Sequence, residues 1–228
     1  MKFLTKTIVI LSVISMMTDI SSEMLYPILP MFLKSIGFSV LWIGILEGFA
    51  EAIAGFSKGY FGRMSDKIGK RVPFVRFGYT LSAISKPLIG IFAMPVLVFL
   101  LRTIDRLGKG VRTAARDAIL SSETTKEYKG RVFGFHRAFD TLGAAIGPIL
   151  ALIYLHYYPN NYVSLFLIAF IPGLIGIIFT FFLHDKKSDV TPFNNNKTKF
   201  LEFLSYWKKS SKSFKKTVVG LIIFTAIN

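Results

Sequence analysis

The stretch RTIDRLGKGVRTAARD, residues 102–117, decides how this chain can fold, and it follows directly on the apolar run Pro95–Leu101. It holds five basic and two acidic residues. At 100° per residue, most of these charges fall within about 140° of one helix face. An ionised side chain near the centre of a bilayer costs roughly 2.5–3.5 kcal/mol, so this face should meet partners or a watery cavity. The alternative is a short buried helix that runs into a basic cytoplasmic loop.

The composition indicates an integral membrane protein. Of the 228 residues, 52% are hydrophobic, 15% aromatic and only 18% charged, which is too apolar for an ordinary soluble domain. The formal net charge of +15 would by itself suggest a nucleic-acid partner. The basic residues are instead spread over the loops of one side, so we expect no nucleic-acid partner.

The sequence offers no sign of an enzyme. It has no cysteine, which excludes disulfides and thiolate metal sites. The histidines His136, His156 and His184 lie on different segments without the spacing of a metal site. No nucleophile elbow or phosphate-binding loop occurs. We therefore expect no catalytic residue, no metal and no cofactor.

Six segments are long enough to cross a hydrocarbon core of about 30 Å, which takes about 20 helical residues. The loops on one side carry nearly all the Lys and Arg outside these segments, whereas the opposite loops carry only Lys34. Because basic loops stay in the cytoplasm, we predict a cytoplasmic amino terminus and a cytoplasmic loop at 184–216. The predicted spans lie near residues 7–33, 40–62, 73–93, 96–115, 132–157 and 163–183.

The predicted fold class is all-α, in three parts. Residues 1–183 form a six-helix transmembrane bundle, 184–216 a cytoplasmic linker, and 217–228 the start of a seventh span. Eleven residues from Thr217 to Ile227 cover only about 16 Å, so we expect this last span to be truncated. In the linker, apolar residues at i, i+3, i+4 and i+7 predict an amphipathic helix, either on the membrane surface or packed on the ends of the spans. They are Phe200, Phe203, Leu204 and Trp207.

Charged residues interrupt the other predicted spans as well. Asp19 and Glu23 lie four residues apart near the middle of the first span. Acids and bases within the spans are nearly balanced, which favours pairing because unpaired buried charges would exceed a domain's stability of about 5–15 kcal/mol. We predict a buried charge network that comprises Glu47, Glu51, Arg112, Arg137 and Asp140.

Small residues mark two predicted helix contacts. Gly143 and Gly147 form a contact pair in the fifth span, and Pro148 beside them predicts a kink. A longer stripe in the second span should also let another helix approach closely. This stripe consists of Gly44, Gly48, Ala52, Gly55 and Gly59.

Between the second and third spans the chain reads GRMSDKIGKR, residues 62–71. This run resembles the cytoplasmic loop signature of the major facilitator superfamily, a loop on which the conformational switch of such transporters depends. Glycines permit a tight turn, an aspartate can accept hydrogen bonds at a helix terminus, and the bases hold the loop in the cytoplasm. The matching residues are Gly62, Asp66, Lys67, Gly69, Lys70 and Arg71.

Two further motifs resemble the same superfamily. Arg106-Leu-Gly-Lys109-Gly110 is similar to its fourth-span pattern, with Lys109 in place of the usual Gln. Gly143-Ala-Ala-Ile-Gly147-Pro148 resembles the fifth-span motif of proton-coupled exporters. The run from Asp105 to Ala118 is similar to a bacterial branch of the superfamily with poorly defined substrates.

The resemblance covers residues 1–183 and matches only the first half of a twelve-span transporter. In that fold two six-helix bundles enclose a site at the midplane of the membrane, and one bundle rocks against the other. The resemblance implies that the first and fourth spans line the cavity. The implied proton and substrate residues are Asp19, Glu23, Arg102, Asp105, Arg106 and Lys109.

The first function hypothesis is secondary transport of a small solute coupled to protons. A carboxyl group removed from water binds a proton more readily and a nearby arginine opposes this, so a carboxyl placed between both can load and release a proton. Asp19 or Glu23 would carry the proton, and Arg102 and Arg106 would pair with it or bind the solute. The basic excess favours an anionic solute slightly over a cation. The alternative is that these four residues form a fixed network that locks the bundle.

The second hypothesis is a half-transporter subunit, or a truncated remnant, without transport activity of its own. Such a chain needs a homodimer or a separately encoded second half, because one bundle has nothing to rock against. Under both hypotheses the chain is a multi-pass protein of the bacterial inner membrane, with the lipid bilayer as its environment.

Overall fold

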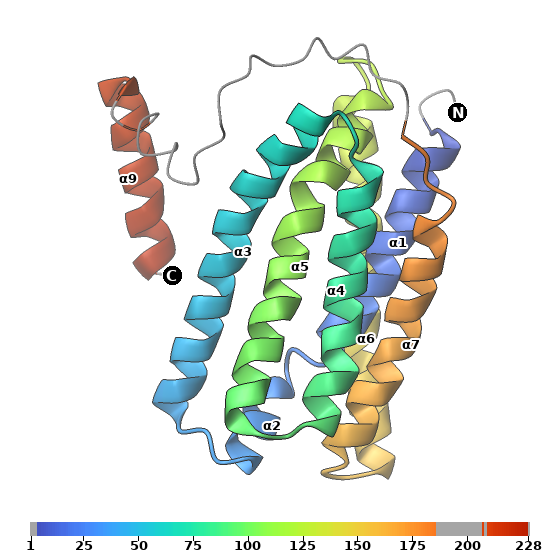
Figure 1. Ribbon diagram of the computed structural model, residues 1–228, viewed down its shortest axis with the longest axis vertical. Coiled ribbons are helices and arrows are strands. Elements are labelled where there is room, and N and C mark those ends of the chain that lie inside the picture. Colours follow the sequence, from blue (N-terminus) through green and yellow to red (C-terminus); the bar gives the residue numbers. More distant parts are fainter. Residues whose placement is uncertain (1–3, 186–206, 208, 228) are drawn as a thin grey trace. The chain divides into compact units, whose positions relative to one another are not determined.

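The computed structural model describes residues 4–185, 207 and 209–227. The chain divides into two compact units, residues 1–191 and 192–228. Within the described residues the secondary structure is helical, and no strand occurs there. In the first unit the helices are α1 (Lys6–Glu23), α2 (Leu29–Ser35), α3 (Val40–Ile68), α4 (Val72–Ile91), α5 (Pro95–Ser122), α6 (Lys129–Tyr157) and α7 (Tyr162–Thr180), as Figure 1 shows.

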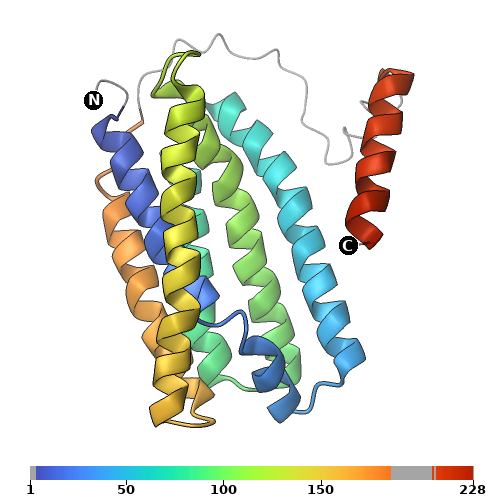
Figure 2. The ribbon, with the colours of Figure 1, turned by 180° about the vertical axis from the view of Figure 1, so that it is seen from behind.

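By their contacts, the long helices of the first unit form a row of neighbours in the order α3, α5, α4, α7, α1, α6. In Figure 1, α3, α5, α4 and α7 lie in front with α1 and α6 behind them, and Figure 2 shows α6 and α1 from the other side. α5 lies between α3 and α4, α1 lies between α6 and α7, and the packing of α4 on α7 joins the two groups. α1 also meets α5 over a short contact. α3 and α6 are the ends of the row and expose large apolar side chains, among them Trp42, Phe49, Ile149 and Leu152.

Two apolar clusters occupy the two ends of this bundle. One contains Phe32 and Phe166, whose ring centroids lie 4.9 Å apart. On α5 this first cluster ends at Leu101, and the second cluster begins at Ala115. The charged residues 102–112 therefore occupy the layer between two apolar clusters, which keep this part of α5 fixed within the bundle.

The first predicted span, residues 7–33, is not one continuous helix. α1 ends at Glu23, and a turn precedes the short helix α2. Pro27 lies in that turn and has no N–H to continue the helical hydrogen bonds, while Pro30 occupies the first turn of α2, where a missing N–H costs nothing. The prolines in the sequence explain the break, which the prediction missed.

The loop that carries the signature at 62–71 is shorter than predicted. α3 continues to Ile68, so Gly62 is helical and does not form a turn. A Cβ placed on Gly62 would lie 2.8 Å from Ala114 Cβ, which shows that this glycine permits a close approach of α5. Within residues 62–71, Gly69 is the residue that adopts the left-handed conformation, with φ of 71°, and it ends α3. α5 is also longer than predicted, because it continues to Ser122.

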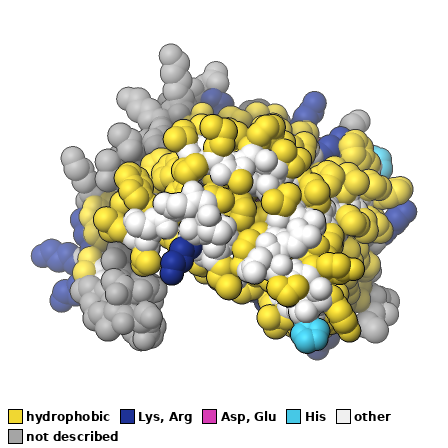
Figure 3. Space-filling model, turned by 90° about the horizontal axis from the view of Figure 1, so that it is seen from below, with side chains coloured by type: hydrophobic (Ala, Val, Ile, Leu, Met, Phe, Trp, Pro, Cys, Tyr) yellow, Lys and Arg dark blue, Asp and Glu magenta, His cyan; other side chains and the backbone are white. Residues whose placement is uncertain are grey.

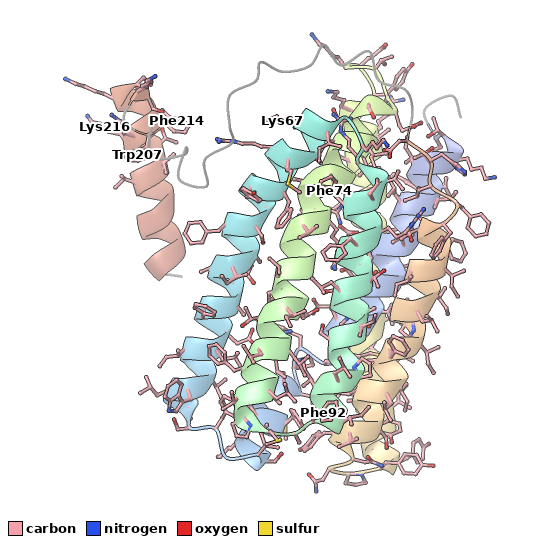
Figure 4. The ribbon with its side chains drawn as sticks, in the orientation of Figure 1. Lys67, Phe74, Phe92, Trp207, Phe214 and Lys216 are labelled. Atoms are coloured by element: carbon pink, nitrogen blue, oxygen red, sulfur yellow. The ribbon has the colours of Figure 1, made fainter. Side chains whose placement is uncertain are left out.

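Among the described residues, α3, α6 and α7 are long and apolar enough to cross a membrane. α1 and α5 also hold charged residues of the central layer. Lys67 and Phe74 lie at one end of the bundle and Phe92 at the other (Figure 4). Viewed from the Phe92 end, the surface consists mainly of hydrophobic and uncharged groups (Figure 3). This asymmetry agrees with the predicted placement of the basic loops on one side.

The second unit contains α9 (Lys212–Ile227). Ser211 precedes this helix and accepts hydrogen bonds from Phe214 N at its side chain and from Lys215 N at its carbonyl oxygen. The helix therefore begins before Thr217, where the sequence analysis placed the seventh apolar segment. The predicted surface helix at 199–209 lies largely outside the described residues, although Trp207 packs edge-on against Phe214.

Candidate functional site

The charged face of α5 pairs with acids of α3. The guanidinium of Arg102 donates to both carboxylate oxygens of Glu47, through Nε at 2.8 Å and Nη2 at 2.9 Å. Its Nη1 donates to Asp105 Oδ2 at 2.9 Å, one turn along α5. Arg102 and Asp105 are both buried. The two-pronged contact of Arg102 with Glu47, together with its bond to Asp105, is the kind of geometry that can offset the desolvation of these charges.

Arg106 extends the same row of ion pairs by one turn. Its Nη2 lies 3.6 Å from Glu47 Oε2, and its Nη1 lies 3.3 Å from Glu51 Oε2. Asp105 on the other side accepts a hydrogen bond from the Ser82 hydroxyl of α4. α5 is thus bonded to α3 and to α4 through charged side chains. The sequence analysis placed the arginines in the cavity and the glutamates in a separate network, and the structure brings them together.

Lys86 of α4 is almost completely buried, with 3% of its surface exposed. Its ammonium donates to Ser21 Oγ at 2.7 Å and to Ser22 Oγ at 3.0 Å, both on α1. No acid lies within ion-pair distance of Lys86 among the described residues. The sequence showed a lysine before Pro87, but nothing in it pointed to these two serines.

A small polar cavity of about 40 Å³ lies between α1 and α5. Besides Arg102, Asp105 and Arg106, it is lined by four charged side chains whose charged atoms form no hydrogen bond or ion pair within the described part of the chain. These are Asp19, Glu23, Lys109 and Arg112. The cavity therefore brings two unpaired acids of α1 to two unpaired bases of α5.

Arg112 has an aromatic neighbour in place of an acid. Its guanidinium carbon lies 4.5 Å from the centroid of the Tyr79 ring, a distance at which a cation is attracted to the ring. The side chain is buried, and its Nη1 has no hydrogen-bond partner. Arg112 was predicted to belong to the same network as Glu47 and Glu51, but those acids pair with Arg102 and Arg106.

A second group of charges lies where α6 meets α1. Arg137 Nη1 lies 3.4 Å from Asp140 Oδ2, and Asp140 Oδ1 lies 3.6 Å from His136 Nε2. On α5, Arg116 Nη1 donates to Ser15 Oγ of α1 at 3.0 Å. The predicted single charge network is thus two clusters, one between α3 and α5 and one around α6.

Glycines fix the close contact of α1 with α6. A Cβ on Gly143 would lie 2.6 Å from Met16 O, and one on Gly147 would lie 2.8 Å from Ile20 O. Pro148 is inside α6, which continues past it to Tyr157. Sequence reasoning missed an equivalent crossing of α4 and α5, where a Cβ on Gly78 would lie 2.6 Å from Gly108 O.

The glycine stripe of α3 has no such neighbour. A Cβ placed on Gly44, Gly48, Gly55 or Gly59 would meet nothing within 4 Å. The stripe and the apolar side chains beside it are uncovered within the described residues, whereas Gly62 further along the same helix is covered by α5.

At the signature loop, Arg71 Nη2 forms an ion pair with Asp66 Oδ1 at 3.1 Å. Lys67 and Lys70 are exposed. A residue that the sequence analysis did not single out completes the loop: Asp185 Oδ1 accepts the backbone N–H of Arg71 at 2.8 Å and of Val72 at 2.9 Å. This carboxylate satisfies two free donors at the start of α4.

Within the described residues, no group of three or more His, Asp or Glu side chains is arranged to hold a metal ion. The bundle has a charged interior layer between two apolar clusters, and several of its helices are long and apolar enough to cross a membrane. This combination defines a polytopic membrane protein with a polar site inside its helical bundle.

The chain belongs to the major facilitator superfamily, whose family model matches residues 11–228. An uncharacterized MFS-type transporter of Methanocaldococcus jannaschii is 36% identical over 225 residues, which are 99% of this chain and 54% of the relative. An uncharacterized protein of Mycobacterium tuberculosis is 30% identical over 166 residues, 73% of this chain and 41% of the relative. A multi-drug resistance efflux pump, PmrA of Streptococcus pneumoniae, is 29% identical over 140 residues, 59% of this chain and 34% of the relative. The chain spans about half the length of the relatives it matches.

Proposed function

We propose that this chain forms the first six-helix half of a secondary active transporter that moves a small solute together with protons. The observation that carries the proposal is the cavity between α1 and α5. There Asp19 and Glu23 have no ion-pair partner among the described residues, although Lys109 and Arg112 line the same cavity. A carboxylate held near positive charge but not bonded to it can bind and release a proton.

The ion-pair partners of Arg102 and Arg106 indicate which basic residues of α5 hold the bundle together and which could contact a solute. Arg102 and Arg106 are bonded to Glu47 and Glu51, so they hold α3 against α5. Among the described residues, Lys109 and Arg112 form no ion pair with an acid, so they are the better contacts for a solute. Two unpaired bases in a cavity favour an anionic solute, which we propose over a cation.

The test is proton flux in proteoliposomes that contain the complete transporter, with this chain as its first half, and the pH-sensitive dye pyranine. Lactate serves as the probe anion and ethidium as the probe cation. Asp19→Asn or Glu23→Gln should abolish flux that depends on the probe. The control is Glu127→Gln, which replaces an exposed acid in the loop before α6 and should leave the flux unchanged. Unaltered pH dependence in both cavity variants contradicts the proton role.

A second candidate is a half-transporter subunit that transports only with a partner, either a second copy or a separate second half. The uncovered glycine stripe and the exposed apolar side chains of α3 and α6 favour it, because such surfaces suit helix packing in a membrane. The mass of the detergent-solubilised protein distinguishes the two candidates. A stable monomer that carries out transport alone excludes the need for a partner.

In this proposal the protein resides in the cytoplasmic membrane. Its amino terminus and the loop 184–216 face the cytoplasm, since the signature loop and most loop bases lie on that side.

A further inference from the structure

His136 and Asp140 form a buried pair on α6, outside the cavity of Asp19 and Glu23. The two residues expose 3% and 6% of their surface. His136 Nε2 lies 3.6 Å from Asp140 Oδ1, and both atoms are buried without a hydrogen-bond partner. Buried polar atoms are rarely left unpaired in folded proteins, so this facing pair needs an explanation.

The opposite ring nitrogen indicates where protons lie. His136 Nδ1 is 3.3 Å from Ser12 Oγ of α1, and Ser12 Oγ lies 2.9 Å from Ile8 O. The contact with Ile8 O is the shorter of the two, and a carbonyl oxygen only accepts, so in this arrangement the Ser12 hydroxyl donates to Ile8. The serine oxygen is then free to accept a proton from His136 Nδ1, whereas a hydroxyl turned to Nδ1 would place the ring proton on Nε2.

With its proton on Nδ1, a neutral imidazole has a lone pair on Nε2. That lone pair would face the lone pairs of Asp140 Oδ1, with no proton between two acceptors. One additional proton removes the conflict, because it gives either an imidazolium beside a carboxylate or an imidazole beside a carboxylic acid.

We propose that His136 and Asp140 hold one exchangeable proton between them, which makes this pair a second proton-binding site of the bundle. The proposal deepens the proposed proton coupling by assigning a site to α6. On release, the pair becomes a neutral imidazole and a carboxylate, and the proton leaves to water.

Release of the proton has a structural consequence for α1. After release, a hydrogen bond from Nε2 to Asp140 requires that the remaining ring proton moves from Nδ1 to Nε2. Nδ1 then becomes an acceptor, and the Ser12 hydroxyl must turn from Ile8 O to Nδ1. The protonation state of α6 is thus coupled to a hydrogen bond within α1.

Other charges surround the pair. On α6, Arg137 Nη1 approaches Asp140 Oδ2 and favours the carboxylate. On α5, Arg116 and Asp117 act on His136 with opposite charges and form an ion pair with each other at 3.0 Å. On α1, the charged neighbour is Asp19, which lies close enough to Asp140 to interact with it electrostatically.

The test is ¹⁵N NMR of the purified full-length chain with labelled histidine, titrated over roughly pH 4 to 9. The chain has only three histidines, so His136→Gln assigns the signal of His136. His156 and His184 are exposed and serve as internal references. The nitrogen shifts report directly which ring nitrogens carry protons.

We expect His136 to carry a proton on Nδ1 and to exchange a second proton with Asp140. Asp140→Asn should lower the proton affinity of His136 roughly tenfold or more, because a carboxylate at this distance favours the imidazolium. A His136 signal that is neutral and protonated on Nε2 at every pH overturns the proposal. A titration that Asp140→Asn leaves unchanged overturns it as well.

A second variant keeps the test decisive if Asp140→Asn does not fold. The Arg137 side chain is 79% exposed, so Arg137→Gln should fold normally. Removing this guanidinium takes away a positive charge that stabilises the Asp140 carboxylate. The pair should then bind its proton more tightly, and its proton occupancy should rise. No change in occupancy contradicts a shared proton. Neither readout involves transport, so failure of the Asp19 and Glu23 experiment and failure of this one are separate results.

Discussion

Arg102 on α5 donates to both carboxylate oxygens of Glu47 on α3, at 2.8 and 2.9 Å. These two residues are 55 positions apart, and together they fix how α3 packs against α5. Arg102 also binds Asp105, so the pair is part of a continuous row of charges in the layer between the two apolar clusters.

Replacing Glu47 should therefore destabilise the bundle. Glu47→Gln removes the charge that compensates the buried Arg102, and we expect a loss of about 2 kcal/mol in the free energy of unfolding. Glu51→Gln is the matched control, since the Glu51 side chain is 63% exposed and its ion pair among the described residues is with Arg106. This variant should change stability by less than about 1 kcal/mol. Unfolding in mixed detergent micelles measures both, and equal effects would argue against the two-pronged pair as the main contribution.

The contact of α1 with α6 should depend on Gly143. In Gly143→Ala the new Cβ would lie 2.6 Å from Met16 O and 3.0 Å from Asp19 Cβ, so the helices must separate, at a cost of about 1–3 kcal/mol. Gly134→Ala on the same helix meets nothing within 4 Å and should stabilise α6 by roughly 0.5–1 kcal/mol. Thermal unfolding of the two variants should shift in opposite directions, and a shift of the same sign would contradict the close packing.

Lys86 should not be needed for folding. Replacing a buried charge by an apolar side chain of similar volume is often neutral or stabilising. Among the described residues, the hydrogen bonds of the Lys86 ammonium go to the Ser21 and Ser22 hydroxyls and not to an acid. Lys86→Met should therefore fold with unchanged or higher thermal stability. Lys86→Ala, which leaves a cavity, should lose about 2 kcal/mol or more. A Met variant as unstable as the Ala variant would show that the charge itself supports the fold.

The start of α4 should depend on Asp185. Asp185→Ala removes two hydrogen bonds, from Arg71 N and Val72 N, and should cost about 1 kcal/mol, as loss of a helix cap does. Amide hydrogen exchange should accelerate in the first turn of α4. Asp66→Asn is the control because the Asp66 side chain is 59% exposed in its pair with Arg71, so exchange at α4 should stay unchanged there.

Much of this architecture could be predicted from the sequence. The apolar spans, the basic loops on one side and the charged face at 102–112 follow from periodicity and charge. The break after Glu23 was also predictable, because Pro27 and Pro30 stand in the chain at that point.

The partners of individual charges could not be predicted. Arg102 pairs with Glu47, and Lys86 bonds to two serines, because of where the helix axes cross. The crossing points of helices cannot be derived from the pattern of a single sequence. The glycine contact of Gly78 with Gly108 decides one of these crossings. Isolated glycines in apolar helices are too common to identify it in advance.

The contacts of α1 differ in chemistry from those of α3. Within the described residues, the side-chain bonds between α3 and α5 are ion pairs. The side-chain bonds that join α1 to α5 use its hydroxyls, such as Ser15 with Arg116, and those that join it to α4 use Ser21 and Ser22. A hydroxyl can rotate to water or to another acceptor without leaving a charge unpaired. The bundle therefore has one seam, between α1 and the α4–α5 pair, that can open and close without breaking an ion pair among the described residues, and the polar cavity lies on that seam.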